Sequence, residues 1–132
     1  MKNLKQVDAV VRMWNTLNID FITELLDNEV EFNSDWVLKP IIGRDNLHSY
    51  LSKKLKTMWV AHQRGLFNCY AELVINPKFK DEVFARLWYQ DENHLTIDRF
   101  IRVSVTTEKI KSIQFMALTQ EETIQFKSFY NE

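Results

Sequence analysis

The sequence predicts a single α+β domain in which three N-terminal helices pack against a curved antiparallel sheet whose concave side forms a pocket. In the first half of the chain, apolar residues mostly recur at spacings of three and four, as on one face of a helix. From Gly65 onward, β-branched and aromatic residues dominate four segments that short polar connectors separate. Helices followed by hairpin-linked strands are typical of the α+β class, with the helices on one face of the sheet.

Two helices are expected at the N-terminus. The apolar face of the first is made of Leu4, Val7, Val10, Val11, Trp14 and Leu17. The segment from Asn18 to Asp20 breaks this pattern, and Asp20 is placed to cap a short second helix. Phe21, Leu25 and Leu26 would form the buried side of that second helix.

A strand and a third helix follow. Val30 and Phe32 alternate with polar residues, which predicts a strand that Trp36-Val37-Leu38 continues and Pro40 interrupts. After Gly43 a helix is expected. Its apolar face consists of Leu47, Tyr50, Leu51, Leu55 and Met58.

The second half of the chain predicts an antiparallel meander. Its four strands are expected at residues 66–75, 82–90, 94–105 and 110–118, and their short connectors indicate hairpins. Thr119 and Glu122 then have the spacing of a capping box, which predicts a short last helix carrying Ile124, Phe126, Phe129 and Tyr130.

Symmetric pairing about each connector predicts which residues face each other. Arg86 would lie opposite Asp98, Trp88 opposite Thr96, and Phe100 opposite Phe115. These residues would line the concave face, together with Cys69 and Ala71. The other face would hold Tyr70, Val74, Ala85, Leu87, Tyr89, Leu95, Ile97, Ile101, Met116 and Leu118, and is also largely apolar. Because such a face needs a cover, we expect a homodimer through the outer sheet face.

Composition excludes several classes of protein. The 132 residues suit one domain (residues 1–132), with 45% hydrophobic and 27% charged residues. A net charge of −1 argues against nucleic-acid binding, and two glycines are too few for a glycine-rich nucleotide loop. The single cysteine, Cys69, and the lack of an apolar leader or span favour a cytoplasmic protein without membrane contact.

The candidate ligand-binding residues are an ion pair and the aromatic rings expected around it. Arg86 and Asp98 form the predicted polar pair, either as a site or as a structural cross-strand ion pair. Trp88, Phe100, Phe115, Trp36 and Tyr50 are the aromatic candidates, with ordinary core packing as the alternative. His48, His62 and His94 lack ligand spacing, so we expect neither a metal site nor a cofactor.

Three stretches resemble the nuclear transport factor two-like superfamily, which includes ketosteroid isomerases, polyketide-cyclase-like proteins and binding-only members. They are the stretch from Asp20 to Phe32, the segment Ile42-Gly43-Arg44-Asp45-Asn46-Leu47, and Ile97-Asp98-Arg99-Phe100 followed by Lys109-Ile110-Lys111-Ser112-Ile113. The resemblance spans about residues 7–118 and implies a cone, a bent sheet wrapped on helices with a pocket at its open end.

The same resemblance suggests two candidate catalytic residues. Asp98 matches the isomerase segment whose protonated acid donates a hydrogen bond to an oxyanion, and Asp35 lies within about one residue of the general base. An ion pair with Arg86 is the alternative for Asp98, and a solvated loop carboxylate for Asp35. The tyrosine of the isomerase pattern is missing, since Arg12-Met13-Trp14 stands there. With Arg86, the two carboxylates also resemble an epoxide-hydrolase arrangement.

We therefore expect a non-catalytic domain that binds a small apolar molecule carrying one polar or anionic group for Arg86. The first alternative is a cofactor-free isomerase, lyase or hydrolase acting on a small apolar organic substrate. The second is a structural dimerisation module whose cone is filled by side chains. Fold alone does not separate these functions.

Overall fold

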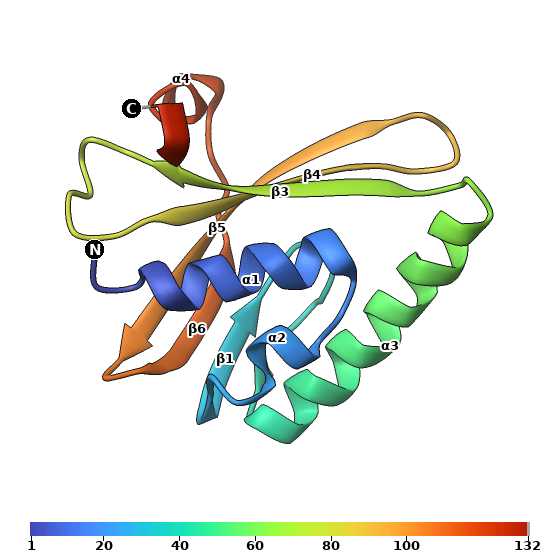
Figure 1. The fold of residues 1–132 in the computed structure, drawn as a ribbon, viewed down its shortest axis with the longest axis horizontal. Helices are drawn as coiled ribbons and strands as arrows, with labels where there is room; N and C mark the ends of the chain where they lie inside the picture. The colour runs from blue at the N-terminus through green and yellow to red at the C-terminus, as the bar shows by residue number, and fades with distance from the viewer. Residues whose placement is uncertain (132) are drawn as a thin grey trace.

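The chain folds with its first three helices packed on one face of a seven-stranded sheet, in a computed structural model that describes residues 1–131 (Figure 1). The helices are α1 (Leu4–Thr16), α2 (Asp20–Thr23), α3 (Arg44–Gln63) and α4 (Gln120–Thr123), with a 3-10 turn at Phe129–Asn131. The strands are β1 (Leu26–Asn33), β2 (Ile41–Ile42), β3 (Asn68–Ile75), β4 (Phe84–Gln90), β5 (Thr96–Thr106), β6 (Lys109–Phe115) and β7 (Lys127–Ser128). The α+β class and the three N-terminal helices are confirmed.

The sheet has the order β2-β1-β6-β5-β4-β3-β7. Strands β3 to β6 form the expected antiparallel meander. Strand β1 joins β6 in parallel, with Leu26 beside Ile110 and Phe32 beside Ile113. This pairing joins segments from the first and last thirds of the chain in one sheet.

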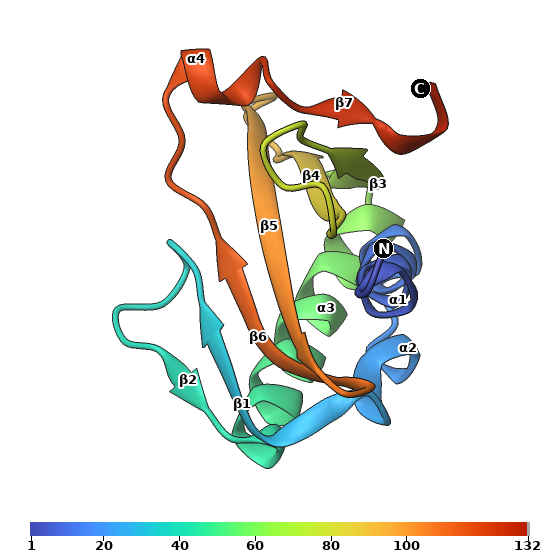
Figure 2. The same ribbon diagram turned by 90° about the vertical axis from the view of Figure 1, so that its left-hand side faces the viewer.

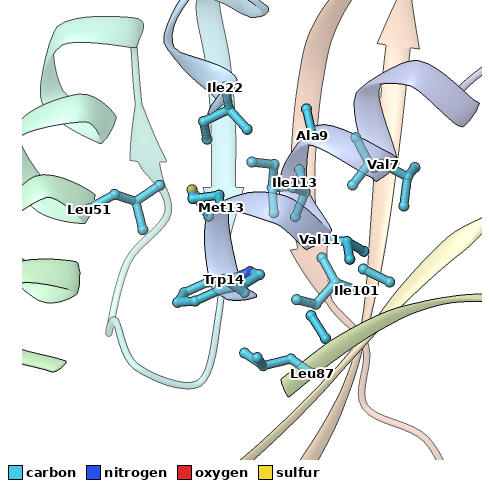
Figure 3. Packing of buried hydrophobic residues seen from close by; sticks show 14 of the residues in the cluster. Val7, Ala9, Val11, Met13, Trp14, Ile22, Leu51, Leu87, Ile101 and Ile113 are labelled. Carbon is cyan, nitrogen blue, oxygen red and sulfur yellow. The ribbon is translucent and has the colours of Figure 1, made fainter. Parts of the chain in front are cut away.

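The main core lies between the helices and the inner face of the sheet. Figure 3 shows Met13 and Trp14 of α1 with Leu51 of α3 and Leu87 and Ile101 of the sheet, and all five are almost fully buried. Large rings and branched side chains fill this interior. The expected pocket on the concave side is therefore occupied by the protein's own side chains.

Element boundaries depart from expectation where tertiary pairing decides them. Leu26 starts β1 rather than ending a helix, because its backbone pairs with β6. The segment Trp36-Val37-Leu38 is a loop and does not extend the strand. Asp20 lies in the first turn of α2 and does not cap it, and Asn18 accepts the Asp20 N–H instead (2.9 Å).

The chain after β6 also differs from the predicted last helix. The capping box of Thr119 and Glu122 is confirmed, but α4 ends at Thr123. Phe126 lies beyond it, followed by β7, which pairs with the end of β3 at Val74 and Ile75. We call residues 116–130 the C-terminal strap. Figure 2 shows it leaving β6, passing through α4 and ending beside β3.

The register of β4 and β5 differs from the expected one by two residues. Arg86 lies opposite Phe100, and Trp88 lies opposite Asp98, two residues from the expected pairing. The connector after Gln90 spans five residues instead of three, with His94 in the left-handed region (φ 60°). Because the shift is two residues, the residues of β4 and β5 that were expected to share a face still share one.

In the two neighbouring hairpins, the observed register differs from the expected one by one residue. A shift of one residue changes which residues of the paired strands share a face of the sheet. Trp88 pairs with Tyr70 rather than Cys69, and Phe115 pairs with Ile101 rather than Phe100. In β5–β6 the expected register holds at the tip, and a bulge between Ser104 and Val105 then displaces it. In β3–β4 the peptide groups of Val83 bond to the Asn3 side chain, and the loop is longer than expected.

Arg86, Trp88, Asp98 and Phe100 therefore lie on the outer face of the sheet, away from α1. Placing them on the concave face was wrong, as was placing Ala85, Leu87, Tyr89, Ile97 and Ile101 outside. Phe115 is on the inner side, as expected, packed in the main core.

The outer face carries a second, smaller hydrophobic cluster. Val74, Phe84 and Phe100 are buried there. Phe126 of the C-terminal strap packs on this cluster, with its ring centroid 5.1 Å from that of Phe84 and 4.6 Å from that of Phe100. The chain thus supplies part of the cover that we expected from a second subunit.

Among residues 1–131, no helix is both long and apolar enough to cross a membrane.

Candidate functional site

A cleft of about 340 Å³ opens where β6 ends and the strap begins. Its charged walls are Asp35, Asp98 and Arg99. Its other walls are Phe100, Phe115, Met116, Ala117, Leu118 and Thr123. The lining is thus mixed, with charged and apolar side chains both facing the cleft. Small-molecule sites likewise combine an apolar surface with a few polar groups that orient the ligand.

The cleft exists because the last strand leaves the sheet early. The pairing of β5 with β6 stops at Ile101 and Phe115, followed by one bond from the Met116 N–H to the Phe100 carbonyl (2.8 Å). Beyond this point the chain turns toward α4, while β5 continues back toward Thr96. The diverging segments leave the edge of β5 exposed between them.

Asp35 and Arg99 form an ion pair at the cleft. Nε and Nη2 of Arg99 donate to Oδ2 of Asp35 at 3.1 and 2.7 Å, and Nη1 donates to the Asp98 carbonyl at 3.0 Å. The hydrogen bond from Arg99 lowers the pKa of Asp35, with smaller contributions from the Arg99 and Lys54 charges, while desolvation opposes the shift. The same bond raises the pKa of Arg99.

Arg86 and Asp98 form the ion pair that the sequence suggested. Nε donates to Oδ1 at 3.0 Å and Nη2 to Oδ2 at 2.6 Å. Because the two residues are diagonal rather than opposite neighbours, the long arginine side chain spans the difference. Both side chains are more than one third exposed, and Glu72 lies 4.0 Å from the other end of the guanidinium. The pair is thus a bidentate contact on the outer face.

Trp36 lies in an aromatic nest at the mouth of the cone. Its ring centroid is 4.8 Å from Phe115, 5.4 Å from Trp14 and 5.9 Å from Tyr89. Its indole N–H donates to the Tyr89 hydroxyl at 3.1 Å, and the Lys54 ammonium lies 4.4 Å above its ring. The Trp36 ring therefore packs against Phe115, which lines the cleft.

Tyr50 lies one step away, on α3. Its ring packs 5.8 Å from that of Phe32, and burial raises the pKa of its hydroxyl. On its solvent side Tyr50 lines a groove of about 520 Å³ with Lys53 and Lys54. Tyr50 is thus a wall between the core and this groove.

The cleft brings together only part of the predicted site. Asp35, Asp98, Phe100 and Phe115 line it. Trp36 and Tyr50 lie behind it, while Arg86 and Trp88 point to the outer face.

Three residues of this region were missed: Arg99, Tyr89 and Lys54. The alternation of Asp98 and Arg99 within an apolar strand was the available signal, since adjacent strand residues face opposite sides. Tyr89 was assigned to the wrong face, and Lys54 was not among the candidates.

Cys69 and the histidines contribute no reactive group here. Desolvation raises the pKa of Cys69 to about 11, and its thiol donates to the Trp14 carbonyl at 3.2 Å. His62 Nδ1 lies 2.9 Å from the Phe67 carbonyl. Within residues 1–131, no three His, Cys, Asp or Glu side chains are grouped so that they could hold a metal ion.

Solved structures of similar shape are known. An NTF2-like protein of unknown function from Cytophaga hutchinsonii has a TM-score of 0.55 and 10% identity, covering 85% of this chain and 96% of its own. A putative polyketide cyclase from Pseudomonas putida has a TM-score of 0.60 and 12% identity, with coverages of 96% and 99%. A steroid delta-isomerase from Pseudomonas aeruginosa has a TM-score of 0.61 and 10% identity, with coverages of 92% and 85%.

Comparison by sequence gave nothing further, since neither a family model nor a curated protein matches the chain. At 10–12% identity, the similar structures define the fold and leave the activity open. The order of elements, the bent sheet and these neighbours agree: the chain has the cone-shaped α+β fold of nuclear transport factor two-like proteins.

Proposed function

We propose that this protein is a small-molecule-binding domain without catalytic activity, and that its ligand enters the cleft at the end of β6. The observation that carries the proposal is a cavity of about 340 Å³ in which apolar side chains lie beside the charged groups of Asp35, Asp98 and Arg99. Its volume lies at the lower end of the usual range for ligand pockets, roughly 300–1,000 Å³.

The ion pair at the cleft favours a ligand that carries a hydrogen-bond donor. Both bonds from Arg99 to Asp35 go to Oδ2, so Oδ1 remains to accept a donor from the ligand. Arg86, which we expected to bind an anionic group, is engaged by Asp98 on the outer face. The proposed ligand is therefore a small apolar body with one hydroxyl or amine group.

The ionisation of Asp35 argues against its use as a general base. A general base works best when its pKa lies near the working pH, whereas Arg99 holds the pKa of Asp35 below its usual range. The catalytic alternative rests on the two carboxylates, Asp35 and Asp98, that line one cleft. If this alternative is correct, the protein would convert a substrate analogue to product as well as bind it.

The test uses three probes with the same ring: phenol, benzylamine and benzoate. We expect phenol and benzylamine to shift the amide NMR signals of residues 115–118 with Kd of about 1 mM, as small fragments do. Benzoate should bind more weakly, because it adds a second anion beside Asp35. Ala117→Trp, which fills the cleft, should abolish these shifts, whereas Gln125→Trp on the exposed part of the strap should not. Shifts that survive Ala117→Trp would refute the site.

We also propose that two copies associate through the part of the outer face that the strap leaves open. Tyr70 is 55% exposed there and lies directly opposite Trp88. Arg86, Glu72 and Asp98 provide charges of both signs around these rings. Such a patch is complementary to its own copy after a two-fold rotation.

Self-association is checked by light scattering coupled to size-exclusion chromatography. The wild-type protein should have the mass of a dimer, and Trp88→Glu should be a monomer because a carboxylate would be buried at the contact. Trp59→Glu, at an exposed tryptophan on α3, serves as the matched control and should remain dimeric. A wild-type monomer at high concentration would contradict the proposal.

A further inference from the structure

Trp36 contacts its surroundings as a bound aromatic ligand would. Three rings contact it, those of Phe115, Trp14 and Tyr89, at angles of 65–78° between the planes. Edge-to-face packing of this kind is the preferred arrangement for an aromatic guest. The Lys54 ammonium above its ring adds a cation–π contact.

The polar contact of Trp36 is equally specific. Its indole N–H, the side chain's hydrogen-bond donor, is bonded to the Tyr89 hydroxyl. The neighbouring indole N–H of Trp14 is buried without a partner among residues 1–131, so the wall of the nest holds an unsatisfied donor. Buried donors of this kind require a partner, which a ligand can supply.

The segment that carries Trp36 has few other attachments. Residues 34–40 lie between β1 and β2 and form neither helix nor strand. Ser34 closes a local turn onto the Trp36 N–H (2.8 Å), and the partly exposed Asp35–Arg99 ion pair ties the loop to β5. Leu38 is fully exposed. The loop is thus held by the Trp36 ring, the partly buried Val37 side chain and one surface ion pair.

The nest adjoins both openings on this side of the molecule. Phe115 lines the cleft and also stacks on Trp36. Lys54 lines the groove on α3 and covers the same ring. Removing the indole would therefore extend the cleft into the interior of the cone.

We propose that Trp36 is an autoinhibitory plug that occupies the place of the ligand's ring. The ligand class that follows is a planar aromatic molecule with one N–H or O–H donor, which displaces the indole and takes over its bond to Tyr89. This inference rests on the proposed function, because the cleft is the entrance through which the ligand reaches the nest. It adds that binding requires the 34–40 loop to move outward.

Indole is the probe for this inference, because it is the side chain of Trp36 as a free molecule. Trp36→Ala should bind indole at least tenfold more tightly than the wild-type protein, since the plug no longer competes. Trp88→Ala, which removes a partly buried tryptophan from the outer face, is the matched control and should leave indole affinity unchanged. Equal indole affinity in Trp36→Ala and the wild type would overturn the proposal.

A second variant tests the same idea in a chain that keeps Trp36. In Tyr89→Phe, the plug and bound indole lose the same hydrogen bond, so indole affinity should stay near that of the wild type. Benzothiophene has the shape of indole without its N–H, so it has no hydrogen bond to Tyr89 to lose. It should bind Tyr89→Phe about three- to tenfold more tightly than it binds the wild-type protein, a ratio that corresponds to the free energy of one hydrogen bond. Unchanged benzothiophene affinity would overturn the plug even if Trp36→Ala failed to fold.

Displacement can be observed directly in the wild-type protein. In NMR spectra, the Trp36 indole N–H signal should move away from the chemical shift of a hydrogen-bonded N–H as indole saturates the site. An indole complex in which this signal stays in place would contradict displacement. Failure of the cleft proposal gives a different result, because the phenol shifts then survive Ala117→Trp. If only the plug is wrong, Ala117→Trp still abolishes the phenol shifts, while Trp36→Ala binds indole no more tightly than the wild type.

Discussion

At the scale of single residues, charge pairs define the polar character of both sheet faces. Arg99 ties Asp35 to the mouth of the cone, while Arg86 ties Asp98 to the outer face. The two acids were both candidates for catalysis, and each is bonded to an arginine instead. Exposed ion pairs of this type contribute roughly 0–1 kcal/mol to stability, so their main effect is to fix orientation.

The Asp35 pair predicts a specific pH dependence. Because Arg99 lowers the folded-state pKa of Asp35 below its ordinary value of 3.8, the pair stabilises the folded protein above that value. The contribution is lost as the pH falls through the folded-state pKa. In Arg99→Gln, NMR titration should show the pKa of Asp35 returning toward 3.8, and the acid dependence of the unfolding free energy should weaken. An unchanged Asp35 titration in this variant would contradict the assignment.

At the scale of elements, the C-terminal strap changes how the sheet meets solvent. Met116, Leu118 and Phe126 of the strap pack against the outer cluster of Val74, Phe84 and Phe100, beside Phe79 of the loop before β4. Phe126 makes the aromatic contacts of the strap with this cluster. The strap is thus an intramolecular cover for one half of the outer face.

Replacing Phe126 should show how much this cover contributes. Phe126→Ala should lower the free energy of unfolding by about 2 kcal/mol, since a buried aromatic contact is lost and a cavity remains. Urea denaturation followed by circular dichroism measures the change. Ile124→Ala, at a residue 73% exposed on the same strap, is the control and should change stability by less than about 0.5 kcal/mol. Equal effects of the two substitutions would show that the strap is not packed as described.

At the scale of the whole molecule, the N-terminus is bonded to the centre of the sheet. Asn3 is 1% exposed, and its amide donates to the carbonyls of Val83 and Val103, both at 3.0 Å. Its side-chain oxygen accepts the Val83 N–H at 2.9 Å. One side chain thus fixes the start of α1 against β5 and against the residue that precedes β4, which lie 100 and 80 residues further along the chain.

Loss of Asn3 should therefore destabilise the entire domain. Asn3→Ala leaves buried backbone groups of Val83 and Val103 without partners, which predicts a loss of about 2–4 kcal/mol in unfolding free energy. Asn46→Ala removes a single exposed amide bond to Ile42 and should cost about 1 kcal/mol or less. Thermal and urea unfolding of both variants measure this difference. A similar loss of unfolding free energy in both variants would indicate that water replaces the Asn3 hydrogen bonds in Asn3→Ala.

The sequence by itself determined the class, the order of elements and the partners Arg86 and Asp98. These follow from periodicity, turn residues and capping signals, which depend on neighbours within a few positions. Only the tertiary structure decided which face of the sheet each strand residue occupies. The bulge after Ser104 shifts one hairpin by one residue, and the longer loop before β4 accompanies the same shift in another, which moves a strand's side chains to the other side. The loop that carries Trp36 was likewise decided by packing, because its ring lies among three other rings and its N–H is bonded to Tyr89.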